Sequence, residues 1–351
     1  MSGKIKVLVV DDSAMVRQIL TKGLSEDPKI EVVGHASDPY VARDQILKLK
    51  PDVLTLDVEM PRMDGVEFLR KLMPQHPLPV LMVSALTEKG KQITLEALEA
   101  GAVDFVTKPS ADIARGLGQM LEELRAKVKT AAQANVSGYK DEKFKVHHAA
   151  PSTLGALAES TDKVIVIGAS TGGTEAIKLV IAQFPPNMPG VVIVQHMPSG
   201  FTKMFADRLN DQCAMTVKEA ESGDRVISGR ILIAPGDFHM RIKRSGGTYI
   251  VKCTQEEKVC GHRPSVEVLM QSVARNVGAN AIGIMLTGMG HDGAEGMLAM
   301  REAGARTFAQ DESTCVVFGM PKAAYDNGGA EKLVPLPNIA QTIIKIFKEK
   351  N

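Results

Sequence analysis

Two hydrophobic patterns alternate along the N-terminal third of the chain. Runs of consecutive apolar residues indicate buried strands at residues 4–10, 32–36, 53–56, 80–83 and 105–106. Between these runs, apolar residues recur at helical spacing at residues 14–24, 39–49, 65–73 and 94–100. Strands that alternate with helices, and that are apolar on both faces, predict a parallel, doubly wound sheet. A charged helix at about 117–130 is expected to close this unit.

A second alternating pattern begins after Thr161. Its expected strands are 164–167, 191–194, 230–233, 249–252 and 282–286, with short ones near 307–309 and 316–317. Residues 245–248 read Ser-Gly-Gly-Thr, a turn typical of an antiparallel hairpin. The fold class is therefore α/β, with two doubly wound parallel-sheet domains and an antiparallel hairpin in the second.

The segment between these patterns, up to residue 160, is rich in Ala, Ser, Gly and Lys and lacks apolar periodicity. These features are typical of a linker. We expect a first domain at 1–125, a flexible linker at 126–160 and a second domain at 161–351. A chain of 351 residues is long enough for two such cores.

Composition narrows the function classes. The net charge is +1, tryptophan is absent and aromatic residues make up 4% of the chain, which disfavours both an overall basic surface and base-stacking side chains for nucleic-acid binding. No apolar run is long enough to cross a bilayer, and the N-terminus lacks the layout of a signal peptide. The four cysteines form no Cys-x-x-Cys pair, so reduced thiols are the default. We therefore expect a cytoplasmic protein without direct membrane insertion.

Polar residues follow four of the expected strands in the first domain. Open parallel sheets gather functional groups at the carboxyl ends of their strands. Asp11 and Asp12 follow the first strand and Asp57 the third, while Ser84 and Lys108 follow the fourth and fifth. Three carboxylates in one pocket repel each other, and Mg²⁺ with oxygen ligands offsets that repulsion. A hydroxyl and an ammonium then suit contacts to a phosphate carried by an aspartate.

The first domain resembles the receiver domain of two-component response regulators, which has a flavodoxin-like fold. The matching segments are residues 9–13, 57–65, 83–85 and 107–109. The resemblance implies that a histidine kinase phosphorylates Asp57. It also implies a Mg²⁺ site formed by Asp11, Asp12 and Asp57. The switch residues implied by the resemblance are Ser84, Phe105 and Lys108.

A glycine-rich turn follows the strand at 164–167. Residues 168–172 read Gly-Ala-Ser-Thr-Gly, which fits G-x-S-x-G between that strand and a helix expected at 175–184. Small neighbours permit the tight turn that exposes the Ser170 hydroxyl, and the helix N-terminus favours developing negative charge. A nucleotide-phosphate loop is the alternative, but the Walker lysine and G-x-G-x-x-G are missing here.

A serine nucleophile needs a base, and an acid should orient that base. His196 emerges at the same sheet edge as Ser170, which favours it without deciding the matter. Asp292 lies in a glycine-rich turn after the strand at 282–286. The other histidines of the domain are His239, His262 and His291, and rival acids are Asp237 and Asp311.

These residues together resemble the catalytic domain of the chemotaxis protein-glutamate methylesterase family, over residues 161 to about 345. The matching segments are residues 167–173, 195–198, 233–237, 262–266, 286–294, 309–312 and 318–322. The resemblance implies Ser170 as nucleophile, His196 as base and Asp292 as orienting acid. Peptide groups near Met289, with Thr171, would stabilise the oxyanion.

The resemblance implies phosphorylation-activated hydrolysis of glutamate γ-methyl esters on methyl-accepting chemotaxis receptors, and deamidation of certain glutamines. Its implied phosphodonor is a chemotaxis histidine kinase, and hydrolysis would need no cofactor. The alternatives are a DNA-binding output domain and a non-enzymatic module in which Ser170 caps a helix. Residues 161–351 are nearly charge-balanced, which disfavours DNA binding. We further expect the unphosphorylated receiver to inhibit the second domain.

Overall fold

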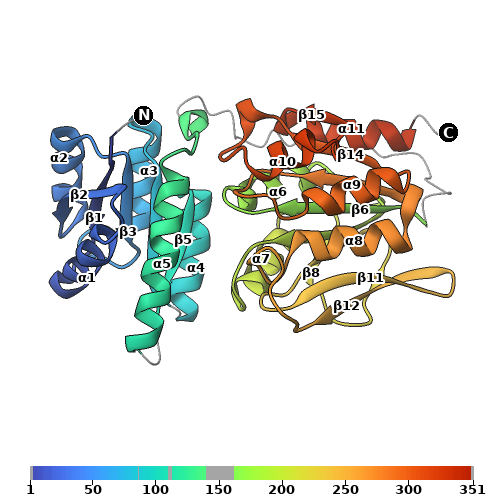
Figure 1. Cartoon of the computed structure of the whole chain (residues 1–351), viewed down its shortest axis with the longest axis horizontal. Helices are drawn as coiled ribbons and strands as arrows, with labels where there is room; N and C mark the ends of the chain where they lie inside the picture. Colours follow the sequence, from blue (N-terminus) through green and yellow to red (C-terminus); the bar gives the residue numbers. More distant parts are fainter. Residues whose placement is uncertain (1–2, 86, 110–112, 140–161, 349–351) are drawn as a thin grey trace. The chain divides into compact units, whose positions relative to one another are not determined.

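The computed structural model describes residues 3–85, 87–109, 113–139 and 162–348 (Figure 1). The chain divides into two compact units, residues 1–145 and 146–351. Within the described ranges, no helix is long and apolar enough to cross a membrane.

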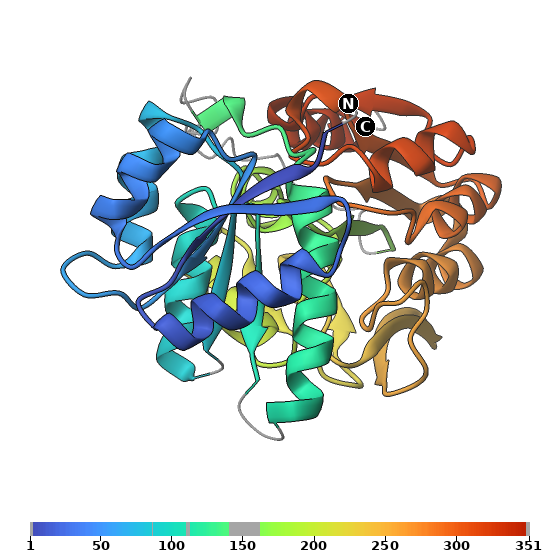
Figure 2. The same ribbon diagram turned by 60° about the vertical axis from the view of Figure 1, so that its left-hand side comes forward.

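The N-terminal unit is built on one parallel sheet with strand order β2-β1-β3-β4-β5, the flavodoxin-like order. Its strands are β1 (Ile5–Val10), β2 (Ile30–Ala36), β3 (Val53–Asp57), β4 (Val80–Ala85) and β5 (Asp104–Lys108). Its helices are α1 (Ala14–Ser25), α2 (Pro39–Leu49), α3 (Gly65–Gln75), α4 (Glu88–Glu99) and α5 (Ile113–Ala131), with the short helix η1 at Ser137–Tyr139. Helix α1 packs with α5 and α3 with α4, so helices cover both faces of the sheet (Figure 2).

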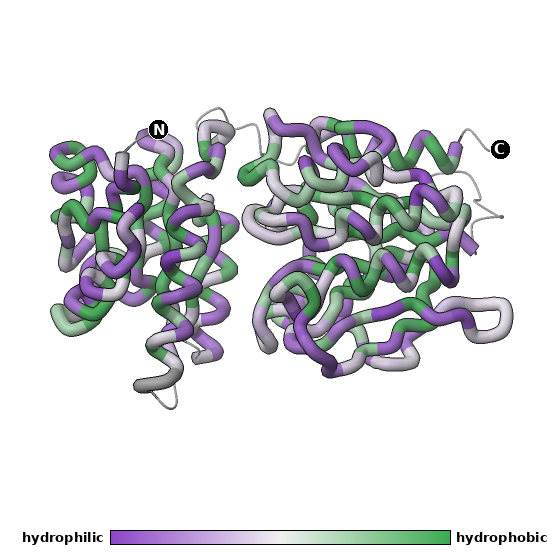
Figure 3. Tube along the Cα trace, viewed as in Figure 1, coloured by the Kyte–Doolittle hydropathy of each residue, from purple (hydrophilic) through white to green (hydrophobic). Residues whose placement is uncertain are grey.

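Local signals explain where these helices begin. The side chains of Ser13, Asp38, Asp64 and Thr87 each accept a backbone N–H in the first turn of the helix that follows. The central strands are fully buried apolar runs, as both-sided coverage requires. Figure 3 shows these runs as green stretches inside the unit.

The C-terminal unit contains a seven-stranded parallel sheet with order β15-β14-β13-β6-β7-β10-β8 and a three-stranded antiparallel sheet with order β11-β12-β9. The strands are β6 (Val164–Ala169), β7 (Gly190–Gln195), β8 (Thr216–Glu219), β9 (Arg225–Val226), β10 (Arg230–Ile233), β11 (His239–Ser245), β12 (Thr248–Thr254), β13 (Ala281–Met285), β14 (Arg306–Gln310) and β15 (Lys332–Val334). The helices are α6 (Gly173–Ile181), α7 (Phe201–Asn210), α8 (Val266–Asn276), η2 (Gly278–Asn280), α9 (Ala294–Glu302), η3 (Glu312–Thr314), α10 (Met320–Asp326) and α11 (Leu336–Lys348).

Helix α8 joins the two sheets of this unit. It packs on β11 of the small sheet and on β6, β7 and β13 of the large one. Its apolar residues Val266, Leu269 and Val273 belong to a core cluster that also holds Val192 and Ile242 from the two sheets. The N-terminus of α8 is thereby fixed beside the carboxyl ends of the large sheet's central strands.

The structure confirms the predicted α/β class, the two parallel sheets and the hairpin, which turns at residues 245–248. The strand expected at 316–317 was wrong: Val317 bonds instead to the side chain of Thr287. Strands β8 and β15 were missed because they are short edge strands without a continuous apolar run. Helix α5 continues through Ala131, into the segment expected as linker, and residues 140–160 of that segment lie outside the described residues.

Candidate phosphoryl-acceptor and active sites

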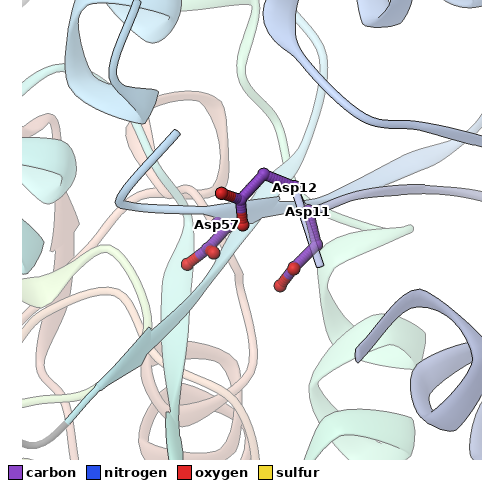
Figure 4. Close-up of side chains that lie close together, drawn as sticks. All are labelled: Asp11, Asp12 and Asp57. Atoms are coloured by element: carbon purple, nitrogen blue, oxygen red, sulfur yellow. The ribbon is translucent and has the colours of Figure 1, made fainter. Parts of the chain in front are cut away.

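Three carboxylates meet at the carboxyl edge of the N-terminal sheet. Asp57 ends β3, and Asp11 and Asp12 follow β1, which pairs with β3 (Figure 4). Their ligand oxygens lie within 4.8 Å of one another, with Asp11 and Asp57 buried and Asp12 exposed. The structure therefore brings together the residues that the sequence predicted at this edge.

Lys108, the last residue of β5, bridges two of these carboxylates. Its Nζ lies 3.0 Å from an oxygen of Asp11 and 3.0 Å from an oxygen of Asp57. Burial raises the pKa of Asp57 to about 6; Lys108 opposes the rise, and the Asp11 charge adds to it. Burial also works against the Lys108 charge, but Asp57 and Asp11 outweigh it and raise the pKa of Lys108.

The donor set fits a hard divalent cation. It consists of carboxylate oxygens only, the ligand type of Mg²⁺, and one carboxylate stays open to solvent. Lys108 lowers the pKa of Asp57 but does not offset the rise caused by burial and, to a smaller extent, by the Asp11 charge, so added positive charge would stabilise the ionised carboxylate.

The expected switch residues are placed as follows. The Ser84 hydroxyl is buried and bonds to α4, accepting from Thr94 Oγ1 at 2.6 Å and donating to Gly90 O at 3.2 Å. Phe105 is buried in β5, with Lys127 Nζ 5.2 Å from its ring centre. Lys108 contacts the carboxylates of Asp11 and Asp57 directly.

We expect Mg²⁺ to raise the thermal unfolding midpoint of the N-terminal unit, and to do so more strongly at pH 8 than at pH 5. Below pH 6 the Asp57 carboxyl holds a proton that competes with the cation, because its pKa lies at about 6. Calorimetry of the full chain with and without Mg²⁺ tests this. Asp57→Asn should remove most of the shift and the exposed Glu31→Gln should not; a shift of equal size in both variants would contradict the assignment.

Ser170 lies in the turn between β6 and α6. Its N–H donates to Thr287 O at 3.0 Å and its C=O accepts from Gln195 Nε2 at 2.9 Å, so residues at the carboxyl ends of both neighbouring strands hold its backbone. Gly172 has a φ of 75°, which favours glycine, and a Cβ there would meet Val316 at 2.6 Å. The half-buried Ser170 hydroxyl makes no hydrogen bond within the described residues.

His196 lies beside Ser170 because Ala169 and Gln195, the residues before them, are partners in the β6–β7 ladder. The His196 Nε2–H donates to Asp292 Oδ2 at 2.7 Å. Its other nitrogen, Nδ1, is buried and has no hydrogen-bond partner among the described residues. The ring is therefore oriented by a carboxylate on one side and has an acceptor position left on the other.

Asp292 lies in the turn before α9, and its buried carboxylate contacts the N-terminus of α8. Besides His196, it accepts from Ser265 Oγ at 2.7 Å, Val266 N at 2.7 Å and Glu267 N at 3.1 Å. Burial alone would raise the pKa of Asp292, but the bonds from His196, Ser265 and Val266 outweigh it and hold the pKa below its usual value. Asp292 therefore remains ionised at neutral pH.

The remaining histidines lie in other settings. His262 stacks on His196, with ring centres 3.7 Å apart and planes 10° from parallel. His239 is fully buried, with its ring bonded to Glu257 O and Ser265 N, and His291 is exposed. The rival acids are bonded elsewhere: Asp237 to Arg263 and Gln255, and Asp311 to Ser313 and Thr314.

The turn that contains Met289 runs directly past Ser170. A Cβ added to Gly288 would meet Ser170 Cβ at 2.8 Å and Ser170 N at 3.1 Å, so only glycine permits this approach. Thr287 Oγ1 donates to Thr171 O at 3.1 Å, which ties the two turns together. Gly288, the residue before Met289, therefore lies against Ser170, and Thr287 bonds to Thr171.

The sequence analysis did not predict the supporting contacts of Gln195 and Ser265, and it named His262 only as another histidine of the domain, not as a residue that stacks on His196. Ser265 precedes an apolar helical run, which marks it as an N-cap, but its bond to Asp292 spans a separation in sequence that no local pattern reveals. Gln195 directly precedes His196 and points to the Ser170 carbonyl, which follows only from the strand pairing.

We expect Asp292→Asn to lower the free energy of unfolding of the C-terminal unit by about 2 kcal/mol at pH 7, because its amide cannot accept all four donors and leaves some unsatisfied in the interior. Urea denaturation measures this. Asp326→Asn, an exposed aspartate on α10, should change stability little. Equal stability of wild type and Asp292→Asn would show that these bonds contribute nothing net.

The described sites define a class of protein: a response-regulator receiver followed by an α/β unit with a serine beside a histidine–aspartate pair. Family models agree. One described as response regulator receiver domain matches residues 7–115, and one described as CheB methylesterase matches residues 165–343.

Relatives extend this likeness to the whole chain. The chain is 68% identical over 352 residues to a protein-glutamate methylesterase/protein-glutamine glutaminase of Syntrophotalea carbinolica, with 100% of this chain and 99% of the relative covered. It is 54% identical to one of Sulfurimonas denitrificans, with 99% of each covered. The crystal structure of the Thermotoga maritima CheB methylesterase catalytic domain is similar, with 40% identity, a TM-score of 0.52 and coverage of 53% of this chain and 99% of that one.

The chain belongs to the CheB methylesterase family, and it is a carboxylic ester hydrolase with a receiver domain. This membership rules against the two alternatives from the sequence analysis, a DNA-binding output domain and a non-enzymatic module.

Proposed function

We propose that the protein hydrolyses glutamate γ-methyl esters on methyl-accepting chemotaxis receptors, deamidates certain receptor glutamines, and is activated by phosphorylation at Asp57. The observation that carries the hydrolytic part is the His196–Asp292 pair at 2.7 Å, next to Ser170 on paired strands. The protein acts in the cytoplasm, where a chemotaxis histidine kinase supplies the phosphoryl group.

Ser170 is the nucleophile of this proposal. Its hydroxyl oxygen attacks the ester carbonyl while His196 Nδ1, the ring nitrogen without a partner, takes the hydroxyl proton. Asp292 stabilises the resulting imidazolium through Nε2. Peptide N–H groups of Met289 and Thr171 are assigned to the oxyanion of the tetrahedral intermediate.

Collapse of that intermediate breaks the bond to the leaving group. The methoxide oxygen takes the proton from His196 and leaves as methanol, and a glutamine side chain would release ammonia in the same way. Water then attacks the acyl-enzyme, again giving its proton to His196, and the product is a glutamate side chain with Ser170 restored. No step requires a cofactor.

The receiver site would hold Mg²⁺ with Asp11, Asp12 and Asp57. A bound Mg²⁺ supplies positive charge that offsets the three carboxylates and the incoming phosphoryl oxygens. The Asp57 carboxylate attacks the phosphorus of the kinase's phosphohistidine, the P–N bond breaks and the kinase keeps its histidine; Lys108, already 3.0 Å from that carboxylate, pairs with the new phosphate. Ser84 would leave its bonds to Thr94 and Gly90 and turn to the phosphate, which is the event that alters α4.

We expect Ser170→Ala and His196→Ala each to lower ester hydrolysis by several orders of magnitude, because one removes the nucleophile and the other its base. Methanol release from methylated receptor membranes measures this, with circular dichroism to verify folding. The matched control is His291→Ala, which removes an exposed imidazole in the neighbouring turn and should retain activity. Near-normal turnover by Ser170→Ala would overturn the nucleophile assignment.

We expect a small phosphodonor with Mg²⁺ to label one site with an acid-stable, base-labile phosphate and to raise the hydrolysis rate. Asp57→Asn should abolish both effects, because the amide is not a nucleophile for phosphorus. Asp44→Asn, an exposed acid on α2, is the control. Persistent labelling of Asp57→Asn would move the acceptor elsewhere, and a rate increase without labelling would disconnect activation from phosphorylation.

A further inference from the structure

A groove of about 600 Å³ opens between β11 and α8 on the C-terminal unit. Four of its lining residues are basic, namely Arg241, Lys243, Arg244 and Arg275, and we call these the cationic groove. Its single acidic lining residue, Glu267, accepts from Gly296 N at 2.8 Å and from Gln271 Nε2 at 2.9 Å. The groove plays no part in the reaction steps above.

The chain leaves most of this positive charge unneutralised. Arg241 pairs with Glu256, with two of its nitrogens bonded to the two carboxylate oxygens. Lys243, Arg244 and Arg275 are exposed, and none of them forms an ion pair within the described residues. Three cations without acidic partners therefore surround one concave surface, which favours an anionic ligand.

The adjoining face of the small sheet is also basic. Arg241 lies directly opposite Lys252 in the β11–β12 ladder, so two cations share one face at close range. Like charges in this position destabilise a sheet, and stability alone does not select for them. Figure 3 shows hydrophilic stretches along this hairpin.

Two lining residues of the cationic groove bond to residues at the active site. The N–H of Glu267, at one end of the groove, donates to Asp292 Oδ1 at 3.1 Å. Val259, another lining residue, exchanges backbone hydrogen bonds with His262, whose ring stacks on His196. Because a helix rises 1.5 Å per residue, Arg275 lies about 12 Å along α8 from Glu267.

We propose that the cationic groove docks an acidic segment of the protein substrate, next to the glutamate ester in the active site. The inference rests on the proposed ester hydrolysis. The ester is neutral and each turnover leaves a carboxylate, so a substrate with several modifiable glutamates carries negative charge beside the reacting one. Arg275, about 12 Å along α8 from Glu267, meets that charge together with Lys243 and Arg244, which line the same groove.

The lining favours an acidic polypeptide over other polyanions. No aromatic side chain lines the groove, so it offers no stacking platform for bases. None of the exposed large hydrophobic residues of the described chain lies in it, which leaves nothing to insert into a lipid surface.

The test compares two substrates of the phosphorylated full-length protein: a soluble methylated receptor fragment and a small, neutral glutamate methyl ester. The triple variant K243E/R244E/R275E should raise KM for the receptor fragment about tenfold or more and leave kcat and small-ester hydrolysis unchanged. Its KM should also lose most of the salt dependence shown by the wild type. The control K345E/K348E reverses two exposed charges on α11 and should match the wild type.

Other outcomes overturn the proposal. An unchanged KM for the receptor fragment removes the docking role, and an equal loss on both substrates assigns the charges to the active site rather than to docking. A difference that appears only with membrane-embedded receptor identifies a lipid-binding surface instead. If the wild type hydrolyses neither ester, the proposed function itself fails. This outcome is read from the wild type alone, so it is distinct from a failure of the docking proposal, which is read from the triple variant.

Discussion

A buried negative charge at Asp292 determines how the C-terminal unit is assembled around its active site. A carboxylate removed from water is stable only if donors surround it. Here the donors come from the end of β7, through His196, and from the first turn of α8, through Ser265, Val266 and Glu267. One charge therefore fixes a strand end, a turn and a helix N-terminus relative to each other. The orientation of the His196 ring, and with it the direction of Nδ1, follows from this arrangement.

The receiver also contains a buried aspartate, Asp57, but its pKa is shifted in the opposite direction. Asp292 is saturated with donors and its pKa is lowered, so its surroundings are suited to one fixed state. Burial raises the pKa of Asp57 to about 6, and the single lysine that it shares with Asp11 does not offset this rise. An undersupplied carboxylate gains from any added cation or from conversion to a phosphate that Lys108 can pair with. The environment of Asp57 therefore suits a residue that changes its chemical state, whereas the environment of Asp292 suits a residue that keeps one charge and one orientation.

The sequence could predict the site residues that lie at the ends of central parallel strands. Asp11, Asp57, Lys108, Ser170 and His196 all follow apolar runs, and strand ends of a parallel sheet meet at one edge. It could not predict contacts that depend on packing between distant segments. Ser265 bonds to Asp292, and His262 stacks on His196, although each pair is far apart in the sequence; for Ser265 this follows from the packing of α8 on both sheets. The apolar pair at 316–317 is not a strand, because Val317 bonds to the Thr287 hydroxyl and its backbone pairing with the Gly288 turn extends only to an isolated bridge at Phe318.

Helix α8 links the chemistry to substrate choice. Its first turn holds the Asp292 carboxylate, and residues about one and two turns further along the same helix line the cationic groove. A small neutral ester offers the active site little to distinguish one glutamate from another. Contacts to charges outside the reacting group bind ground state and transition state alike, so they lower KM without changing kcat. A helix that carries both functions lets selectivity for a protein segment be adjusted at its C-terminal half while the buried hydrogen bonds at its N-terminus stay intact.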